Sequence, residues 1–293
     1  RCFQPMTKDC EKVVLATRKS PLALRQAELA SSALQRAIGA EVEILPLSTT
    51  GDQRLEWSLE QEGGKGLFTK ELEVALLDGR ADLAVHSAKD MPTDLPQGLA
   101  LAGYLPREDP RDVLVIRDEV EVPRVIATGS PRRRAQILHG SWSDAEVREI
   151  RGNVGTRLRK IAEGREADAT ILAAAGLRRL GIDEFAGLRF ECLALEAMVP
   201  APGQAAIALQ SREDEIDRFT RACDPVTAEE VNFERSVLAT MGGGCQVAVG
   251  IHRKGDRVYL FDGAGEGLFK QVDLTGIPYP ASIDRTLSCL GRK

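Results

Sequence analysis

Short apolar segments with strand-like alternation are separated by segments of helical periodicity along the first two thirds of the chain. The first lobe predicted from this pattern has strands at 13–17, 41–47 and 82–86, and helices at 21–38 and 67–77. Ser20 offers a helix N-cap and Pro21 suits the first helical position, which marks the start of the first helix. Such an alternation favours a mostly parallel sheet with helices on its faces.

A segment with two prolines and several charges, 105–111, predicts a linker, and the alternation resumes beyond it. The later predicted strands are 124–128, 147–150 and 169–173, the helices are 131–139, 154–162 and 174–180, and 201–210 is expected to return to the first lobe. A helix at 229–240 and strands at 247–251 and 257–261 predict a small third domain. We therefore expect a first α/β lobe at 12–105 plus about 203–224, a second at 110–200, and a small α+β domain at 228–293. A ligand would bind in the cleft between the lobes, at the carboxyl ends of the strands.

Composition narrows the class of partner. A net charge of −5 and an aromatic content of 4% argue against nucleic acid and acidic membranes as partners. No run approaches the ~18 apolar residues of a membrane span. Arginines nevertheless gather locally, with 132–134 consecutive and others near 148–159. A basic interior site in an acidic protein indicates a small polyanionic ligand, and we expect a monomer.

Six cysteines are scattered along the chain without a CxxC pair. This spacing disfavours zinc, so we expect no metal. It also shows no disulfide framework, which favours a reducing compartment. We expect the cytoplasm, or the stroma or matrix of an organelle if the N-terminus is a processed end.

Two predicted strand-to-helix turns carry arginines where a helix N-terminus would bind an anion. In the first, Thr128 and Ser130 precede Arg132 and Arg133, and a free helix start with two guanidiniums suits a carboxylate or phosphate. The second is the segment 151–157, with two glycines and two flanking arginines. Each turn alone is also compatible with a surface helix and solvated charges. Both belong to one lobe, so their strand ends could converge on one cleft.

Two further segments carry reactive side chains. Lys89 and Asp90 follow the predicted strand 82–86, where a plausible acid–base pair and a turn with exposed charges are both compatible with the sequence. His86 lies in the strand pattern and is expected in the core. Three glycines precede Cys245, which predicts either an exposed thiol or an inert cysteine in a glycine-rich hairpin.

Taken in order, these motifs resemble one family closely. The matching segments are Ala16–Leu24, Gly63–Glu73, Ala84–Pro92, Glu108–Asp112, Arg151–Leu158, Ala175–Gly181 and Gly243–Gln246. The family is porphobilinogen deaminase, and the resemblance covers about residues 12–250. It implies two periplasmic-binding-protein-like α/β lobes around a cleft, plus a small α+β third domain. It implies a transferase of tetrapyrrole biosynthesis that deaminates four porphobilinogens and joins them head to tail into hydroxymethylbilane.

The resemblance also implies roles for individual residues. Cys245 would carry a dipyrromethane cofactor through a thioether, and Asp90 with Lys89 would be catalytic. The implied cofactor contacts are Ser87, Lys89, Asp90, Thr128, Ser130, Arg132, Arg133, Arg151 and Gly152. The implied contacts to the substrate, porphobilinogen, are Arg18, Ser20, Gln26, Phe68, Arg157 and Arg179.

Some positions depart from the family pattern. Gly129 and Pro131 replace serine and leucine, and Ala205 and Gln210 replace glycine and glutamate. The extra methyl at Ala205 is expected to shift the backbone near the cleft. Two alternatives stay open on the residues alone: a two-lobed protein that binds a small anion, and a family member that has lost activity.

Overall fold

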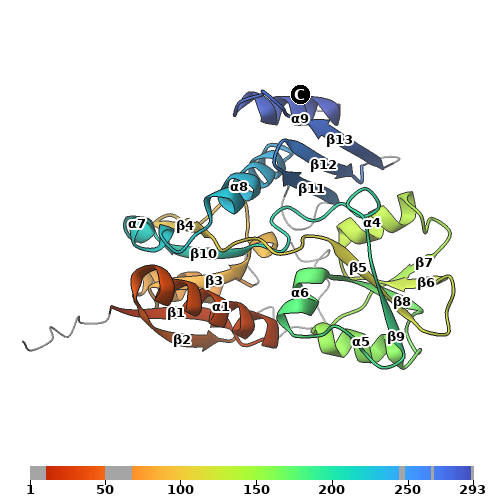
Figure 1. Cartoon of the computed structure of the whole chain (residues 1–293), viewed down its shortest axis with the longest axis horizontal. Coiled ribbons are helices and arrows are strands. Elements are labelled where there is room, and N and C mark those ends of the chain that lie inside the picture. The colour runs from red at the N-terminus through yellow and green to blue at the C-terminus, as the bar shows by residue number, and fades with distance from the viewer. Residues whose placement is uncertain (1–10, 50–67, 244–247, 265–266, 292–293) are drawn as a thin grey trace, which may run out of the picture.

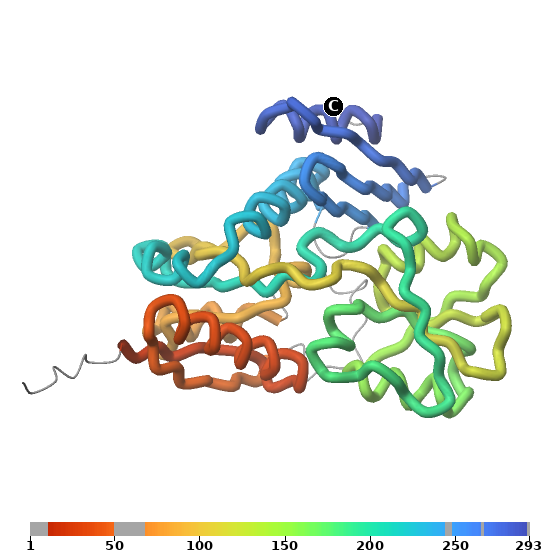
Figure 2. The backbone as a smooth tube through the Cα atoms, in the orientation of Figure 1, coloured from red at the N-terminus to blue at the C-terminus, as the bar shows by residue number. Residues whose placement is uncertain are grey.

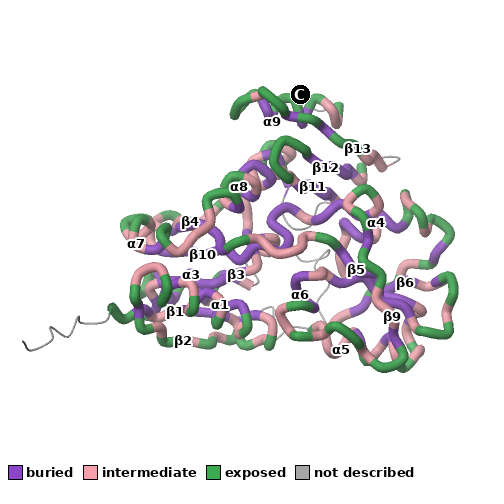
Figure 3. The backbone as a smooth tube through the Cα atoms, in the orientation of Figure 1, coloured by how far each residue is buried: buried purple, intermediate pink, exposed green. Residues whose placement is uncertain are grey.

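Three β-sheets with flanking helices make up the part of the chain that the computed structural model describes, residues 11–49, 68–243, 248–264 and 267–291 (Figure 1). Cys245 and the glycine-rich segment before Phe68 therefore lie outside the described residues. The central strands of the sheets are largely buried, while edge strands such as β2 and β7 and the outward surfaces of the helices are more exposed (Figure 3).

The first sheet has the strand order β2-β1-β3-β10-β4. Its strands are β1 (Lys12–Arg18), β2 (Glu41–Leu47), β3 (Leu83–Ser87), β4 (Leu99–Tyr104) and β10 (Ile207–Arg212). β1 runs parallel to β2 and β3, whereas β10 runs antiparallel to β3 and β4. Helix α1 (Pro21–Ile38) packs its apolar stripe on one face, and α3 (Lys70–Leu77) covers the other.

The second sheet repeats this plan with the order β7-β6-β8-β5-β9. Its strands are β5 (Asp112–Arg117), β6 (Val125–Ala127), β7 (Glu146–Arg148), β8 (Ala169–Ala173) and β9 (Leu188–Cys192), with helices α4 (Pro131–His139), α5 (Val154–Ala162) and α6 (Ala174–Arg179). Here β5 is the antiparallel strand. The predicted, mostly parallel α/β architecture is thus confirmed. The single antiparallel strand of each sheet arrives from the other lobe: β10 overlaps the segment expected to return to the first lobe, whereas β5 was not predicted as a strand.

The third sheet is antiparallel and small. Its strands are β11 (Val249–Lys254), β12 (Arg257–Asp262) and β13 (Leu268–Asp273), packed against α8 (Pro225–Thr240) and α9 (Ala281–Cys289). The sequence predicted two of these strands and one helix. It missed β13 and also α9, although α9 is amphipathic and buries Ile283 and Leu287. A short helix, α7 (Ile216–Thr220), joins β10 to α8.

Local capping explains the helix starts that the sequence predicted well. Ser20 and Ser130 each accept a backbone N–H at the start of α1 and α4, and each precedes a proline. Several predicted boundaries were wrong, among them the end of β11, which lies at residue 254 rather than 251. α3 begins at residue 70 rather than 67, α8 begins at 225 rather than 229 because Asp224 caps it, and β7 covers 146–148 rather than 147–150.

Two connections cross between the sheets side by side (Figure 2). The first crossing segment is 105–111, between β4 and β5, and the second is 201–206, before β10. The Arg107 guanidinium donates to the carbonyl of Gln204 at 2.9 Å, and the Gln204 amide donates to the carbonyl of Pro110 at 2.7 Å. The segments that join the lobes therefore support each other.

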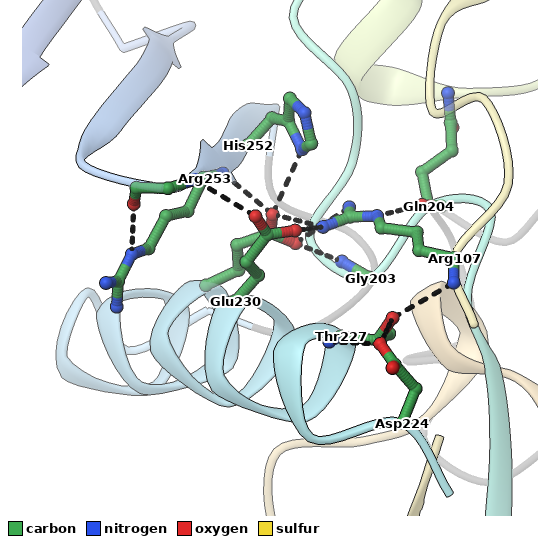
Figure 4. A network of polar contacts seen from close by, with 10 residues as sticks. Arg107, Gly203, Gln204, Asp224, Thr227, Glu230, His252 and Arg253 are labelled. Atoms are coloured by element: carbon green, nitrogen blue, oxygen red, sulfur yellow. Dashed lines mark hydrogen bonds and ion pairs between the residues drawn. The ribbon is translucent and has the colours of Figure 1, made fainter. Parts of the chain in front are cut away.

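Glu234 of α8 ties both crossing segments to the third sheet. Figure 4 labels its partners Arg107, Gly203, His252 and Arg253. The fully buried carboxylate of Glu234 accepts two hydrogen bonds from Arg107, at 2.7 and 3.1 Å, and one from the backbone N–H of Gly203, at 2.7 Å. His252 and the N–H of Arg253 contact it from β11. Burial alone would raise the pKa of Glu234, but Arg107 and His252 hold it at about 2. One carboxylate thus joins three parts of the fold.

Glu234→Gln should lower the free energy of unfolding by about 3 kcal/mol, because it removes the nearest counter-ion of the buried Arg107 and leaves it the more distant Glu230, at 3.8 Å. Urea unfolding monitored by circular dichroism would measure the loss. The matched control is Glu229→Gln on the same helix, because Glu229 is largely exposed although it pairs with Arg253 at 2.6 Å. The control should cost less than about 0.5 kcal/mol. Equal losses for the two variants would contradict the assignment.

Candidate functional site

A pocket opens at the carboxyl ends of β1 and β3 in the first sheet, and we call it the first-lobe pocket. Its lining consists of Arg18, Ser20, Leu22, Ala23, Gln26, Phe68, Thr69, Val85, His86, Ser87 and Asp90. This is the edge at which ligands of such sheets bind. The structure therefore brings together six of the residues expected here: Arg18, Ser20, Gln26, Phe68, Ser87 and Asp90.

Local interactions hold the side chains of this pocket in place. Ser20 caps α1 by accepting the N–H of Ala23 at 3.3 Å. The amide of Gln26, buried on α1, donates to the Ser87 hydroxyl at 2.9 Å. The Arg18 guanidinium lies over the Phe68 ring, 4.2 Å from its centroid, in a cation–π contact.

The turn that carries Lys89 and Asp90 is fixed by the second crossing segment. The N–H of Ala88 donates to the carbonyl of Ala206 at 3.0 Å. Gly203 has a φ of +73°, and a Cβ at this position would lie 3.0 Å from the Cβ of Ala88. Only glycine combines this backbone conformation with this close approach. Movement of the crossing segment would therefore move Asp90.

The two arginine-bearing turns of the second sheet are adjacent. Gly129 approaches the other turn so closely that a Cβ there would lie 3.2 Å from the carbonyl oxygen of Ile150. The Arg157 side chain bonds back to the carbonyl of Gly152 at 2.8 Å. In the first turn, the N–H of Ser130 donates to the Thr128 hydroxyl at 3.2 Å. The expectation that these turns share one region agrees with this geometry.

Arg132 and Arg133 are buried and share a carboxylate that the sequence analysis missed. Asp112, the first residue of β5, accepts from Arg132 at 2.7 Å and from Arg133 at 2.8 Å. Burial would raise the pKa of Asp112, but the two guanidiniums hold it well below its usual range. The Nε atoms of both arginines are buried without a hydrogen-bond partner among the described residues. The pair is anchored, yet it retains donor capacity.

Positive charge from both lobes converges around Lys89. Burial and then the neighbouring Arg133 lower the pKa of Lys89 to about 8, although Asp90 and Asp112 oppose this shift. Burial and the charges of Arg133 and Arg151 lower the pKa of Arg157 to about 10. Burial is the larger cause of both shifts, and the neighbouring guanidiniums add to it because like charges disfavour each other's charged form. The donor set therefore fits a ligand rich in carboxylates.

Two other expected ligands are engaged by acidic side chains. Arg151 pairs with the largely exposed Glu149. Arg179 pairs with Glu108 at 2.7 Å and donates to the carbonyl of Ala205 at 2.5 Å, so it contacts both crossing segments. Ala205 has a φ of +71°, a left-handed conformation that favours glycine. Alanine thus holds, beside Arg179, a backbone conformation that the glycine of the family pattern would adopt more easily.

Ala248, the first described residue after the segment around Cys245, lies beside α4. Gly263 makes a backbone hydrogen bond to Ala248 at 2.9 Å. A Cβ on Gly263 would lie 2.8 Å from the Cβ of Ala248 and 3.0 Å from that of Ala135 on α4. Ala248, three residues beyond Cys245, is therefore next to the helix that carries Arg132 and Arg133.

Three structurally important residues were missed in the sequence. Asp112 was read as part of a motif only, Gln204 as part of an apolar return segment, and Asn153 was not recognised as the cap of α5. Asn153 had a usable signal, because asparagine before a helical stripe is a common N-cap. Asp112 and Gln204 act through contacts distant in sequence, which no local pattern reports.

Comparison with known proteins assigns the chain. The family profile described as "Porphobilinogen deaminase, dipyromethane cofactor binding domain" matches residues 13–219. The porphobilinogen deaminase of Oceanobacillus iheyensis is 44% identical over 260 residues, which cover 85% of this chain and 83% of that protein. The chain belongs to the porphobilinogen deaminase family.

The similarity of this family member to solved structures is weaker than its sequence similarity to other porphobilinogen deaminases. The periplasmic VFT2 domain of Bordetella pertussis BvgS aligns with a TM-score of 0.44 and 20% identity, over 78% of this chain and 92% of that one. An arginine-specific periplasmic binding protein of Salmonella typhimurium aligns with a TM-score of 0.41 and 11% identity, over 75% and 94%. At these values the family assignment rests on the sequence matches.

Two observations concern the described residues of this family member only. None of their helices is both long and apolar enough to cross a membrane. No group of three or more histidine, cysteine, aspartate or glutamate side chains within the described ranges is placed to hold a metal ion.

The Lys89 amine should titrate near pH 8, and bound carboxylates should raise that midpoint. Competitive acetylation between pH 6 and pH 10, read by peptide mass spectrometry, would measure it, with the exposed Lys270 as internal comparison. Because the folded pKa lies below the unfolded value of 10.5, the folded chain should gain stability as the pH rises from about 8 to about 10.5. A Lys89 midpoint that stays above pH 10 would contradict this description of the site.

Proposed function

We propose that this chain is a porphobilinogen deaminase that joins four porphobilinogens head to tail into hydroxymethylbilane and releases ammonia at each addition. The proposal is carried by the 44% identity to a porphobilinogen deaminase over 85% of the chain. The convergence of cations from both lobes on Lys89 supports it, because the substrate and every chain intermediate are polycarboxylates.

Charge balance explains why so many arginines are needed. Each pyrrole unit carries two carboxylates, so a chain of up to six rings brings about a dozen negative charges into one cleft, and unpaired buried charge is costly. Forked guanidiniums neutralise carboxylates and fix their orientation through paired hydrogen bonds. We propose that Arg18, Arg132, Arg133, Arg151 and Arg157 serve in this way. Arg179 would join them when a substrate carboxylate replaces Glu108 beside it.

We propose that Asp90, with Lys89 beside it, assists proton transfer and stabilises the charge that develops during the reaction. The aminomethyl group must leave as ammonia, and the substrate carbon it leaves behind becomes electron-poor. A carboxylate at this point stabilises that positive charge and accepts hydrogen bonds from pyrrole N–H groups. Asp90 lines the first-lobe pocket, and its turn is held by the second crossing segment. Lys89, with a pKa of about 8, sits where it can balance the charge of incoming carboxylates.

The proposed cofactor is a dipyrromethane attached to Cys245 by a thioether, and when bound it supplies the terminal pyrrole to which the first substrate unit is joined. Three residues of chain reach at most about 11 Å from Ala248, which lies beside α4. Ser87, Thr128, Ser130 and Gly152 add neutral polar and backbone contacts at the adjacent strand ends. These contacts and the buried donors of Arg132 and Arg133 fit such a group.

We also propose the domain division given by the sequence, at 12–105 plus about 203–224, 110–200 and 228–293, and a monomeric enzyme. The cysteines at 192, 223 and 289 are free thiols, which supports a reducing compartment such as the cytoplasm.

Cys245→Ser should give protein without a covalently bound pyrrole and without activity, because serine has no sulfur with which to form the thioether. Intact-protein mass spectrometry would show the wild type heavier than its polypeptide by a two-ring adduct, with ladders of added units after incubation with porphobilinogen. Cys192→Ser, at an exposed thiol, is the matched control and should keep the adduct. A wild type that binds porphobilinogen without consuming it would instead be a binding protein or an inactive family member.

Asp90→Ala should retain the fold and the covalent adduct but lose at least about 1,000-fold in kcat, the scale expected when a charge-stabilising group is removed. Asp90→Glu should be milder because it keeps the carboxylate. Ammonia release and tetrapyrrole absorbance measure turnover, and circular dichroism checks the fold. The assignment to Asp90 fails if the alanine variant turns over at a near-normal rate.

A further inference from the structure

His86 is a buried side chain of the first-lobe pocket to which the proposed reaction gives no role. It lies on β3, only 5% exposed, four residues before Asp90 in sequence, and it contributes to the pocket lining. Its Nε2 atom is 2.9 Å from the side-chain oxygen of Gln210 on β10. The charged groups around it are Arg18 at the end of β1, Glu73 on α3 and Asp90 beyond β3.

A chain of hydrogen bonds determines which nitrogen of His86 carries the proton. The Gln210 amide nitrogen donates to the Glu73 carboxylate at 3.3 Å. A carboxylate only accepts, so it orients the amide with its NH₂ toward Glu73 and its oxygen toward His86. That oxygen also only accepts, so Nε2 of His86 must carry a hydrogen. Glu73 thus determines, through Gln210, the direction of the whole chain.

The same surroundings keep the imidazole uncharged. Gln210 is fully buried and Glu73 is 7% exposed. Burial, assisted by the charge of Arg18, lowers the pKa of His86 to about 4 although the Gln210 hydrogen bond opposes the shift. A neutral imidazole with Nε2–H leaves Nδ1 as an acceptor. No hydrogen bond to Nδ1 occurs among the described residues. Nδ1 is also not one of the completely buried side-chain atoms for which a partner is missing.

We infer that Gln210 is a positioning residue: oriented by Glu73, it holds His86 as the neutral Nε2–H tautomer, so that Nδ1 accepts a hydrogen bond from an N–H group of the bound substrate. This rests on the proposed function, since porphobilinogen offers N–H donors at its ring and its aminomethyl group. Asp90 and His86 then recognise the N–H groups of the substrate, while the arginines bind its carboxylates. A polycarboxylate without N–H donors gains only the second set of contacts.

The tautomer can be measured directly because the chain has only three histidines. Long-range ¹H–¹⁵N spectra of ¹⁵N-histidine-labelled holoenzyme, assigned with His86→Gln, should show His86 neutral with its proton on Nε2 between pH 6 and pH 8. A proton on Nδ1, or a charged ring in this range, would overturn the inference. This measurement needs no turnover, so it stands apart from the test of the proposed function.

Kinetics of two His86 variants test the acceptor itself. In His86→Asn the amide oxygen can replace Nδ1, whereas in His86→Gln the polar group falls near the Nε2 position. His86→Asn should keep the KM for porphobilinogen within about threefold of the wild type, and His86→Gln should raise it about tenfold, the scale of one hydrogen bond. A merely structural role would change both variants alike, and equal KM values would refute the inference.

Gln210→Glu supplies a third readout. A second carboxylate cannot donate to Glu73, and it favours a protonated His86 whose Nδ1 donates instead of accepting. KM should therefore rise at low pH and recover as the pH increases, a dependence that the wild type lacks. The matched control is Gln136→Glu, which changes an equally buried glutamine of α4. Within the described ranges its side chain hydrogen-bonds only to the backbone of Val199, at 2.7 and 2.9 Å. The same pH dependence of KM in the control would count against Gln210.

Discussion

The pairing of Asp112 with Arg132 and Arg133 is the interaction on which the rest of the structure depends. Two adjacent guanidiniums cannot be buried without a carboxylate between them, and Asp112 supplies one at the point where the first crossing segment becomes β5. Gln204 from the second crossing segment donates to the same carboxylate at 2.8 Å. The junction of the lobes and the cationic site are therefore built from the same side chains, so the charge that a polyanionic substrate requires also orients the connection between the lobes.

A second buried carboxylate, Glu234, acts in the same way on the other side of the crossing. It fixes Arg107 and Gly203, and Gly203 in turn packs against the turn that carries Lys89 and Asp90. One carboxylate and one glycine thus connect the third sheet to the turn that carries Lys89 and Asp90, and Arg235 of α8 donates to the carbonyls of Met91 and Pro92 just beyond it. The C-terminal part of the chain therefore supports the described pocket without lining it.

Much of the fold could be predicted because its determinants are local. Ser20 with Pro21, and Ser130 with Pro131, mark helix starts through hydrogen bonds within one turn, and the ordered motifs identified Arg18, Gln26 and Asp90 as neighbours of one site. The rest depends on contacts between distant segments. The antiparallel direction of β5 and β10 has no local signature. Asp112 lies 20 and 21 residues before its two partners, and the Gln210 side chain reaches a helix more than 130 residues earlier.

The position of β10 has a consequence for how the chain acquires its structure during synthesis. β10 lies between β3 and β4, so the first sheet has a gap in its middle until residue 212 has been made. The second sheet is complete once residue 192 has left the ribosome. The lobe that begins the polypeptide is therefore the later of the two to close, the reverse of the usual order in which domains fold as they emerge. Until then β3 and β4 have unpaired edges that a nascent chain must keep from other partners.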